Sequence, residues 1–330
     1  MRLIPNGLAS QSGYAPTSTR VRSPLADHQT TSLVAAAVVA RRSSAGEPSA
    51  TRSALCGRPA PTAAEDPSFG TTSLICREEH FRLPEYHRWC AELKEDPVFQ
   101  RKQWEFVYIL AALERAGVLK SGARALGFGV GREVLPALFA ARGIQVTATD
   151  QSLSQGLSSG WVGYGLHADG LAALSHPKII ADAELKRLVS FKEVDMNHVP
   201  SDLQGYDFLW SACSMEHIGS LDQTLAFVER AMACLRPGGI AVHTTEFNCG
   251  SDEHTITSGP TVLLRRRDFV ALSERLARHG HVMAPIDVAL GDGFLDQWVD
   301  LPPFNQDASL RLLIERHVAS SAGMIIRRAQ

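Results

Sequence analysis

Three glycines separated by single residues lie near the middle of the chain, at Gly127, Gly129 and Gly131 in the stretch ALGFGVGRE. An apolar run precedes them, a helix-like stretch follows, and Asp150 ends the next apolar run. Glycines in such a loop permit positive φ and let a ligand approach the backbone closely. An acid at the next strand end can accept hydrogen bonds from both hydroxyls of a ribose. The pattern predicts a nucleoside site, with helix capping as the other role open to Asp150.

The spacing of the glycines separates two classes of nucleoside ligand. The dinucleotide fingerprint is G-x-G-x-x-G, whereas here the pattern is G-x-G-x-G, followed by Arg132 and Glu133. A pyrophosphate requires the free N–H groups of a helix N-terminus. An amino-acid tail can use the backbone of the loop and a nearby side chain instead. The loop therefore favours a nucleoside that carries such a tail.

A second polar strand end follows in VDMNHVP, which contains Asp195 and Met196. At the end of a third strand, a carboxylate can accept from the exocyclic amine of adenine, and a methionine can cover the ring. The alternative is an acid that only stabilises a turn.

Apolar strands and amphipathic helices alternate from the glycine loop onward. This alternation is typical of right-handed βαβ units and of a mostly parallel sheet that is covered on both faces. The predicted fold class is α/β, doubly wound. We expect strands at 123–128, 144–149, 189–195, 206–213, 239–247 and 322–328, and helices at 132–142, 221–235 and 266–280.

The chain before the glycine loop divides into two parts. Residues 1–70 are rich in Ser, Ala, Thr, Pro and Arg and contain no lysine, a composition typical of a disordered leader. An organellar transit peptide or a misassigned start codon would give a similar composition. Residues 71–121 form an N-terminal helical segment, in which 106–113 has one apolar face and Gly122 ends the helix. Residues 122–330 form the main domain.

Composition narrows the classes of function. The chain has 330 residues, of which 45% are hydrophobic and 21% charged, with a formal net charge of −2. This balance is ordinary for a globular enzyme and lacks the basic excess of nucleic-acid-binding proteins. The six cysteines form no CxxC pair, and the longest apolar run near the N-terminus is too short to span a bilayer. We expect a cytoplasmic protein with no metal site, no membrane segment and no nucleic-acid partner.

Several motifs together resemble a known family. ALGFGVGRE, TATD, VDMN, YDFLWSACSMEHIGSL and CLRPGGIAVHTTEFN are similar to class I S-adenosylmethionine-dependent methyltransferases, over residues 76–330. The resemblance implies a seven-stranded Rossmann-like methyltransferase sheet with N-terminal helices. It implies S-adenosyl-L-methionine as the cofactor and a small-molecule acceptor. Where many members carry an acid before the glycines this chain has none, so Glu133 becomes a candidate partner of the methionine amino group.

Methyl transfer needs a base only where the acceptor has a proton to lose. Glu216 and His217 follow the fourth strand, so His217 is a candidate general base, although the pair can also merely shape the loop. Ser211, nearer the strand end, is expected to line the cofactor site. Glu246, near the end of the fifth strand, is expected either to reach the substrate or to form an internal salt bridge.

The long insertion after Asp150 is a candidate flap over the cofactor, in which Trp161 and His167 face the site. His254 is a further candidate. His243, Asp252 and His254 match no common metal-ligand spacing.

The predicted function is methyl transfer from S-adenosyl-L-methionine to a small-molecule acceptor, most simply a hydroxyl of a sugar or another metabolite. Two alternatives stay open. An NAD(P)-dependent oxidoreductase would need the longer glycine spacing, and a non-catalytic nucleoside-binding scaffold would lack room for an acceptor. The sequence does not indicate an oligomeric state.

Overall fold

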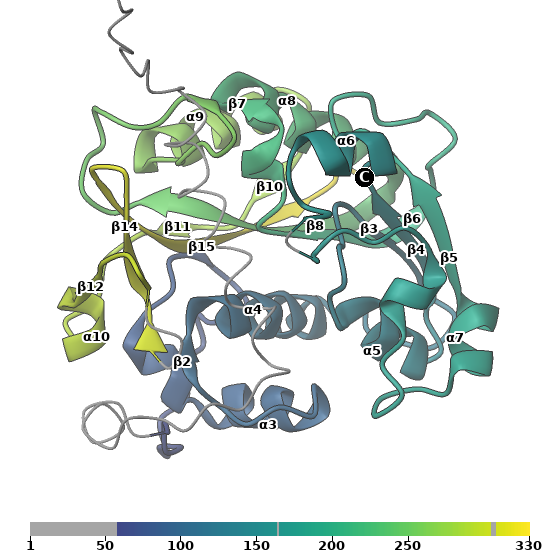
Figure 1. Cartoon of the computed structure of the whole chain (residues 1–330), viewed down its shortest axis with the longest axis horizontal. Coiled ribbons are helices and arrows are strands. Elements are labelled where there is room, and N and C mark those ends of the chain that lie inside the picture. Colours follow the sequence, from purple (N-terminus) through teal and green to yellow (C-terminus); the bar gives the residue numbers. More distant parts are fainter. Residues whose placement is uncertain (1–57, 164, 305–307) are drawn as a thin grey trace, which may run out of the picture.

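The computed structural model describes residues 58–163, 165–304 and 308–330, and its centre is a single large β-sheet (Figure 1). Along the sheet the strands lie in the order β12-β14-β15-β8-β6-β3-β4-β5, and β10 pairs with β15. The seven longer strands are β3 (Arg124–Gly127), β4 (Gln145–Asp150), β5 (Val189–Glu193), β6 (Tyr206–Ala212), β8 (Leu235–Asn248), β14 (Arg311–Ile314) and β15 (His317–Arg327). The two-residue strands β10 (Val282–Met283) and β12 (Val299–Asp300) complete the nine strands that the described residues contribute.

Neighbouring strands from β5 to β8 are parallel, and β15 runs antiparallel to both β8 and β14. The chain moves outward from β3 to β4 and β5 and then returns to β6 on the other side of β3. The predicted α/β, doubly wound and mostly parallel fold is confirmed. The order reverses between β3 and β6, which is where ligands bind in open α/β sheets.

Helices cover both faces of the sheet (Figure 1). On one side lie α3 (Pro84–Glu92), α4 (Arg101–Arg115), α5 (Leu135–Ala141) and α7 (Asp182–Leu188); on the other lie α8 (Leu221–Ala231) and α9 (Arg266–Ala277). Two further helices are short: α6 (Leu153–Ser158) follows β4, and α10 (Phe294–Gln297) precedes β12. No helix in the described ranges is both long and apolar enough to span a bilayer.

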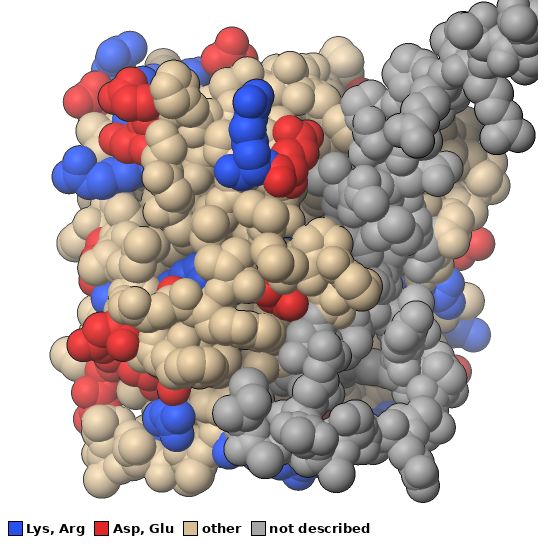
Figure 2. All heavy atoms as spheres, turned by 60° about the vertical axis from the view of Figure 1, so that its left-hand side comes forward, with Lys and Arg blue, Asp and Glu red and all other residues tan. Residues whose placement is uncertain are grey.

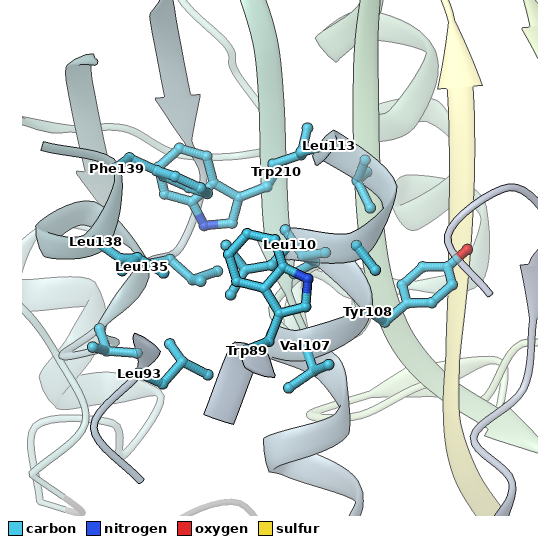
Figure 3. Packing of buried hydrophobic residues seen from close by; sticks show 14 of the residues in the cluster. Trp89, Leu93, Val107, Tyr108, Leu110, Leu113, Leu135, Leu138, Phe139 and Trp210 are labelled. Atoms are coloured by element: carbon cyan, nitrogen blue, oxygen red, sulfur yellow. The ribbon is translucent and has the colours of Figure 1, made fainter. Parts of the chain in front are cut away.

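Strand β6 illustrates why this sequence forms a sheet with two covered faces. Side chains alternate along a strand, and Phe208 and Trp210 join the core under α4 and α5, whereas Leu209 joins the core under α8 and α9. Figure 3 shows Trp210 beside Phe139 of α5 in the first of these cores. A strand buried on both faces is rich in consecutive apolar residues, as β6 is at positions 208–210.

The N-terminal helices belong to the same core as the sheet. Trp89 of α3 and Leu110 of α4 lie in one buried cluster with Phe139 and Trp210 (Figure 3), so the expected boundary at residue 121 marks no break in the core. The expected helix end at Gly122 is wrong, because α4 ends at Arg115. The segment also contains the two-residue strands β1 (Ser73–Leu74) and β2 (Phe99–Gln100).

The last residues of the expected leader are part of the folded protein. Phe69 is fully buried and packs against the rings of His80, Trp104 and Tyr108. The predicted boundary at residue 70 is therefore too late, because an aromatic side chain in the core belongs to the domain. Residues 1–57 lie outside the described residues.

One contact between helix α4 and the sheet depends on a glycine, which has no side chain. Gly323 of β15 faces Tyr108 of α4, and a Cβ at position 323 would lie 2.0 Å from Cε1 of that ring. The Tyr108 hydroxyl donates to the carbonyl of Thr72 at 2.8 Å. Glycine at this position lets α4 lie close to the sheet.

The surface carries charges of both signs. On the face in Figure 2, Lys and Arg side chains lie among Asp and Glu side chains, and in its described part neither sign gathers into a large area.

Candidate functional site

A cavity of about 570 Å³ opens at the carboxyl ends of β3, β4, β5 and β6. This volume lies within the range of about 300–1,000 Å³ that is usual for small-molecule sites. Its walls come from the glycine loop, from the loops after these strands, from the chain around α6, and from the first turns of α4. The cavity therefore lies at the point where the strand order reverses.

Two of the three predicted glycines line this cavity. Gly129 and Gly131 have φ of +58° and +50°, conformations that other residues adopt only with strain. A Cβ on Gly131 would lie 2.6 Å from the carbonyl oxygen of Leu166, and one on Gly129 would lie 2.7 Å from Cβ of Ser214. Gly127 does not line the cavity. It ends β3, where a Cβ would lie 2.4 Å from Cζ2 of Trp210.

Asp150 ends β4 and lines the cavity with its carboxylate largely buried. Its Oδ1 accepts from the N–H of Gln151 at 2.8 Å, and its Oδ2 accepts from the N–H of Ala168 at 2.9 Å. Burial raises the pKa of Asp150, although these N–H groups oppose the shift. The two oxygens have about four lone-pair sites between them, so both can accept further hydrogen bonds.

Asp195 and Met196 line the cavity after β5. Asp195 accepts from the N–H of Asn197 and from Nδ1 of His198, each at 2.8 Å. Burial alone would raise the pKa of Asp195, but these two hydrogen bonds outweigh it and lower the pKa. Met196 is 7% exposed, with its sulfur beside Gly129.

His217 lines the cavity from the short helix Met215–His217. Its Nδ1 lies 2.8 Å from the carbonyl oxygen of Pro260, which can only accept, so Nδ1 carries the proton and Nε2 is the basic nitrogen. Burial lowers the pKa of His217 to about 4. The ring of Trp161 packs edge-on against it at 4.7 Å, so the expected flap does reach the site.

Glu216 and Glu246 lie behind the cavity wall rather than in it. Glu246 forms an ion pair with Arg101 of α4 at 2.7 Å, and both side chains are almost fully buried. Of the two roles open to Glu246 in the sequence, the structure contains the internal salt bridge. Glu216 is fully buried, and its Oε1 lies 3.9 Å from Nε2 of His217. Burial, reinforced by the charge of Glu246, raises the pKa of Glu216 to about 7.

Lys102 and Glu105 of α4 connect this buried cluster to the cavity, which both residues line. Nζ of Lys102 lies 3.2 Å from Oε1 of Glu105 and 3.7 Å from Oε1 of Glu246. The thiol of Cys213, just after β6, donates to the same Glu105 oxygen at 3.0 Å. Sequence reasoning missed the two α4 residues because it followed only the apolar face of this helix. The available signal was that RKQWE places three charges in its first turns.

Among the described residues, Cys213, Glu216 and Glu246 bring possible metal-ligand atoms within 4.8 Å of one another. The guanidinium of Arg101 lies 2.7 Å from the carboxylate of Glu246, so this possible ligand already has a positively charged partner. His243, in contrast, lies in the core, where its Nδ1 is 2.7 Å from Oγ of Ser211.

The structure does not place Ser211 in the cavity. Strand alternation turns this residue toward the face under α8, where it is fully buried beside His243. His254, the further candidate after β8, is also absent from the lining. His167, from the flap, lines the cavity with its Nδ1 at 3.4 Å from Oδ2 of Asp150.

Comparison with known proteins gives structural neighbours only. No protein-family model matches the chain, and no curated protein matches it. The structural neighbours include a putative sarcosine dimethylglycine methyltransferase from Galdieria sulphuraria, with 15% identity, a TM-score of 0.41, and coverage of 69% of this chain and 85% of that one. The methyltransferase domain of bacterial CtHen1 has 13% identity and a TM-score of 0.43, with coverage of 69% and 100%. The DhpI–SAH complex has 16% identity and a TM-score of 0.37, with coverage of 76% and 94%. At these identities the likeness does not establish what this chain binds or does, which has to follow from its own site.

Proposed function

We propose that this chain is an S-adenosyl-L-methionine-dependent methyltransferase that acts on a small molecule. One observation carries the proposal: Gly129 and Gly131, Asp150, and Asp195 with Met196 follow three adjacent parallel strands and line a single cavity. Each supplies one element that a nucleoside with an amino-acid tail requires, and the cavity lies at the switch point of the sheet.

The residues that would hold the cofactor follow from this arrangement. The glycines at positions 129 and 131, whose positive φ other residues would adopt only with strain, leave no side chain between the loop and the ligand. Asp150 would accept from the ribose hydroxyls with its remaining lone pairs. Met196 would cover the adenine ring while Asp195 accepts from its amine. Gly127 would act through packing on Trp210, and Ser211 has no part in this assignment.

The bound cofactor supplies an activated methyl group on a sulfonium. The residues of this chain would hold the acceptor in line, exclude water and take up its proton. An acceptor oxygen that receives this methyl group would have to lose its proton. The acceptor proton would pass to Nε2 of His217, which lines the cavity and carries no proton of its own.

Glu216 and Glu246 would support this proton transfer from behind the wall. With a pKa of about 4, His217 is a weak base, whereas Glu216 beside it titrates at about 7. Glu216 would therefore stabilise the proton that His217 receives. Glu246 would be a positioning residue, because its charge raises the pKa of Glu216 and its carboxylate holds Arg101.

For the acceptor we propose a hydroxyl group of a sugar or another metabolite. A base beside the cavity is useful only where the acceptor loses a proton in the reaction. The formal net charge of −2 gives no support to a nucleic-acid substrate.

Two other functions fit the cavity less well. A dinucleotide-dependent oxidoreductase would place a third glycine where this chain has Arg132. A non-catalytic nucleoside-binding protein would have no use for a histidine at the cavity wall backed by a carboxyl that titrates near neutrality.

Calorimetric titration of the full chain with S-adenosylmethionine, S-adenosylhomocysteine and NAD⁺ tests the proposal. We expect the two sulfur nucleosides to bind and NAD⁺ not to bind. The Asp150→Asn variant should bind both sulfur nucleosides more weakly. The control variant Asp222→Asn changes an exposed residue of α8 and should bind them with unchanged affinity. Binding of NAD⁺ alone would return the glycine loop to the dinucleotide enzymes.

A further inference from the structure

Glu133 is a cavity-lining carboxyl group that has no cationic partner among the described residues. It lies two residues after Gly131, is half-buried, and accepts a hydrogen bond from Nε1 of Trp210 at 2.5 Å. Within the described ranges, no Lys, Arg or His side chain forms an ion pair with it, in contrast to Glu105 and Asp150 in the same cavity. A carboxylate that is partly removed from water and has no counter-charge is destabilised, which favours either the protonated form or a nearby cation.

The charged groups around Glu133 act in the same direction. Asp150 from β4 and Glu105 from α4 both repel a negative charge on it. Burial lowers the pKa of His176, which also lines the cavity, so its ring offers Glu133 no positive charge at neutral pH. Burial, followed by these two acids, raises the pKa of Glu133 well above its usual value, although the Trp210 hydrogen bond opposes the shift. The surroundings of Glu133 therefore disfavour a negative charge on it while no cation is beside it.

We propose that Glu133 holds a proton in the free protein and releases it when the cationic group of a ligand enters the cavity beside it. The cavity would then favour ligands that carry an ammonium or sulfonium group, and it would bind them more tightly as the pH rises. That S-adenosylmethionine is such a ligand rests on the proposed function. No bond between heavy atoms changes; the carboxyl O–H bond breaks, its proton passes to solvent, and the carboxylate remains opposite the ligand cation.

Proton release has a defined thermodynamic signature. If one proton leaves on binding, affinity rises by up to about tenfold per pH unit between the pKa of Glu133 in the complex and its pKa in the free protein. Below that window the carboxyl stays protonated in both states, and above it the carboxyl is ionised in both. A neutral nucleoside without the amino-acid tail gives no such slope.

The experiment titrates the full chain with S-adenosylmethionine and with 5′-methylthioadenosine from about pH 5.5 to about pH 7.5, below the range in which α-amino groups lose their proton. Each titration is repeated in two buffers of different ionisation enthalpy, which counts the protons released. We expect S-adenosylmethionine to bind more tightly with rising pH and to release close to one proton. The affinity for 5′-methylthioadenosine should be independent of pH.

Glu133→Gln tests the assignment because its amide oxygen can still accept from Trp210. This variant should lose both the pH slope and the proton release, while Glu274→Gln, an exposed acid on α9, should keep them. A slope that persists in Glu133→Gln, or binding of S-adenosylmethionine to the native protein without proton release, would overturn this inference and leave the proposed function standing. If neither nucleoside binds the native protein, the proposed function fails first, and this inference fails with it.

Discussion

Replacing Glu246 by glutamine should destabilise the protein strongly even though the shape of the side chain is preserved. Glu246 is 4% exposed, and its carboxylate is 2.7 Å from the Arg101 guanidinium, whose side chain is 2% exposed. Removing one charge of a buried pair typically costs about 3–5 kcal/mol, because the other charge stays buried without compensation. Arg101 keeps Ser321 at 3.0 Å and Glu105 at 3.6 Å, so we expect the lower end, about 3 kcal/mol.

Urea denaturation of the full chain, followed by tryptophan fluorescence, measures this loss in the free energy of unfolding. Glu184→Gln is the matched control, since Glu184 pairs with Arg187 on the surface and should leave the free energy unchanged. A second variant replaces both partners, Arg101→Met with Glu246→Leu, and should recover most of the loss because no charge remains stranded. A loss below about 1 kcal/mol in Glu246→Gln would refute the view that this buried pair stabilises the packing of α4 against the sheet.

Four further outcomes are expected. Asp150→Ala should weaken S-adenosylmethionine binding by about tenfold or more in calorimetry, since hydrogen bonds to a charged group contribute about 1.5–3 kcal/mol each; unchanged affinity would remove it from the ribose role. His217→Ala should lower the methylation rate by about 10²–10⁴-fold at unchanged cofactor affinity. An equal loss of cofactor affinity would show that His217 only lines the site and is not the base. The methylation rate of the native protein should rise with pH through about 7 as Glu216 ionises, and Glu216→Gln should abolish that inflection. The same pH–rate profile in both proteins would exclude a role for Glu216 in proton transfer. Phe69→Ala should lower the free energy of unfolding, measured with denaturant, by about 3–5 kcal/mol. A smaller loss, typical of a residue outside the core, would contradict the burial of this ring.

The features predictable from the sequence are those that a single segment determines. Each strand of the parallel half was predicted within a few residues, because an apolar run bounded by turn residues is a local signal. Asp150 and Asp195 reach the same cavity because parallel strands bring their carboxyl ends to one edge of the sheet. For these residues, knowing the fold class was enough to expect their proximity.

The features that the sequence could not provide depend on packing between distant segments. Nothing local indicates that Arg101 meets Glu246, because that contact is fixed only when α4 lies against the sheet. Ser211 was misplaced for a related reason: its position near a strand end suggested the cavity, whereas the alternation of the strand turned it into the core beside His243. Phe69 was missed because a lone aromatic residue in a polar, Pro- and Ser-rich segment carries no periodic signal.

The bare backbone at Gly323 links the width of the cavity to a position outside the cavity lining. A methyl group there would lie 2.0 Å from the ring of Tyr108, whereas carbon atoms in contact are about 3.5–4.0 Å apart. Relief of that overlap moves α4 outward, and Glu105 and Lys102 lie only about 4.5 and 9 Å along the same helix, at 1.5 Å per residue. Both line the cavity. The width of the cavity is thus adjustable by substitution of a single glycine in β15, without a change in any side chain that lines the cavity.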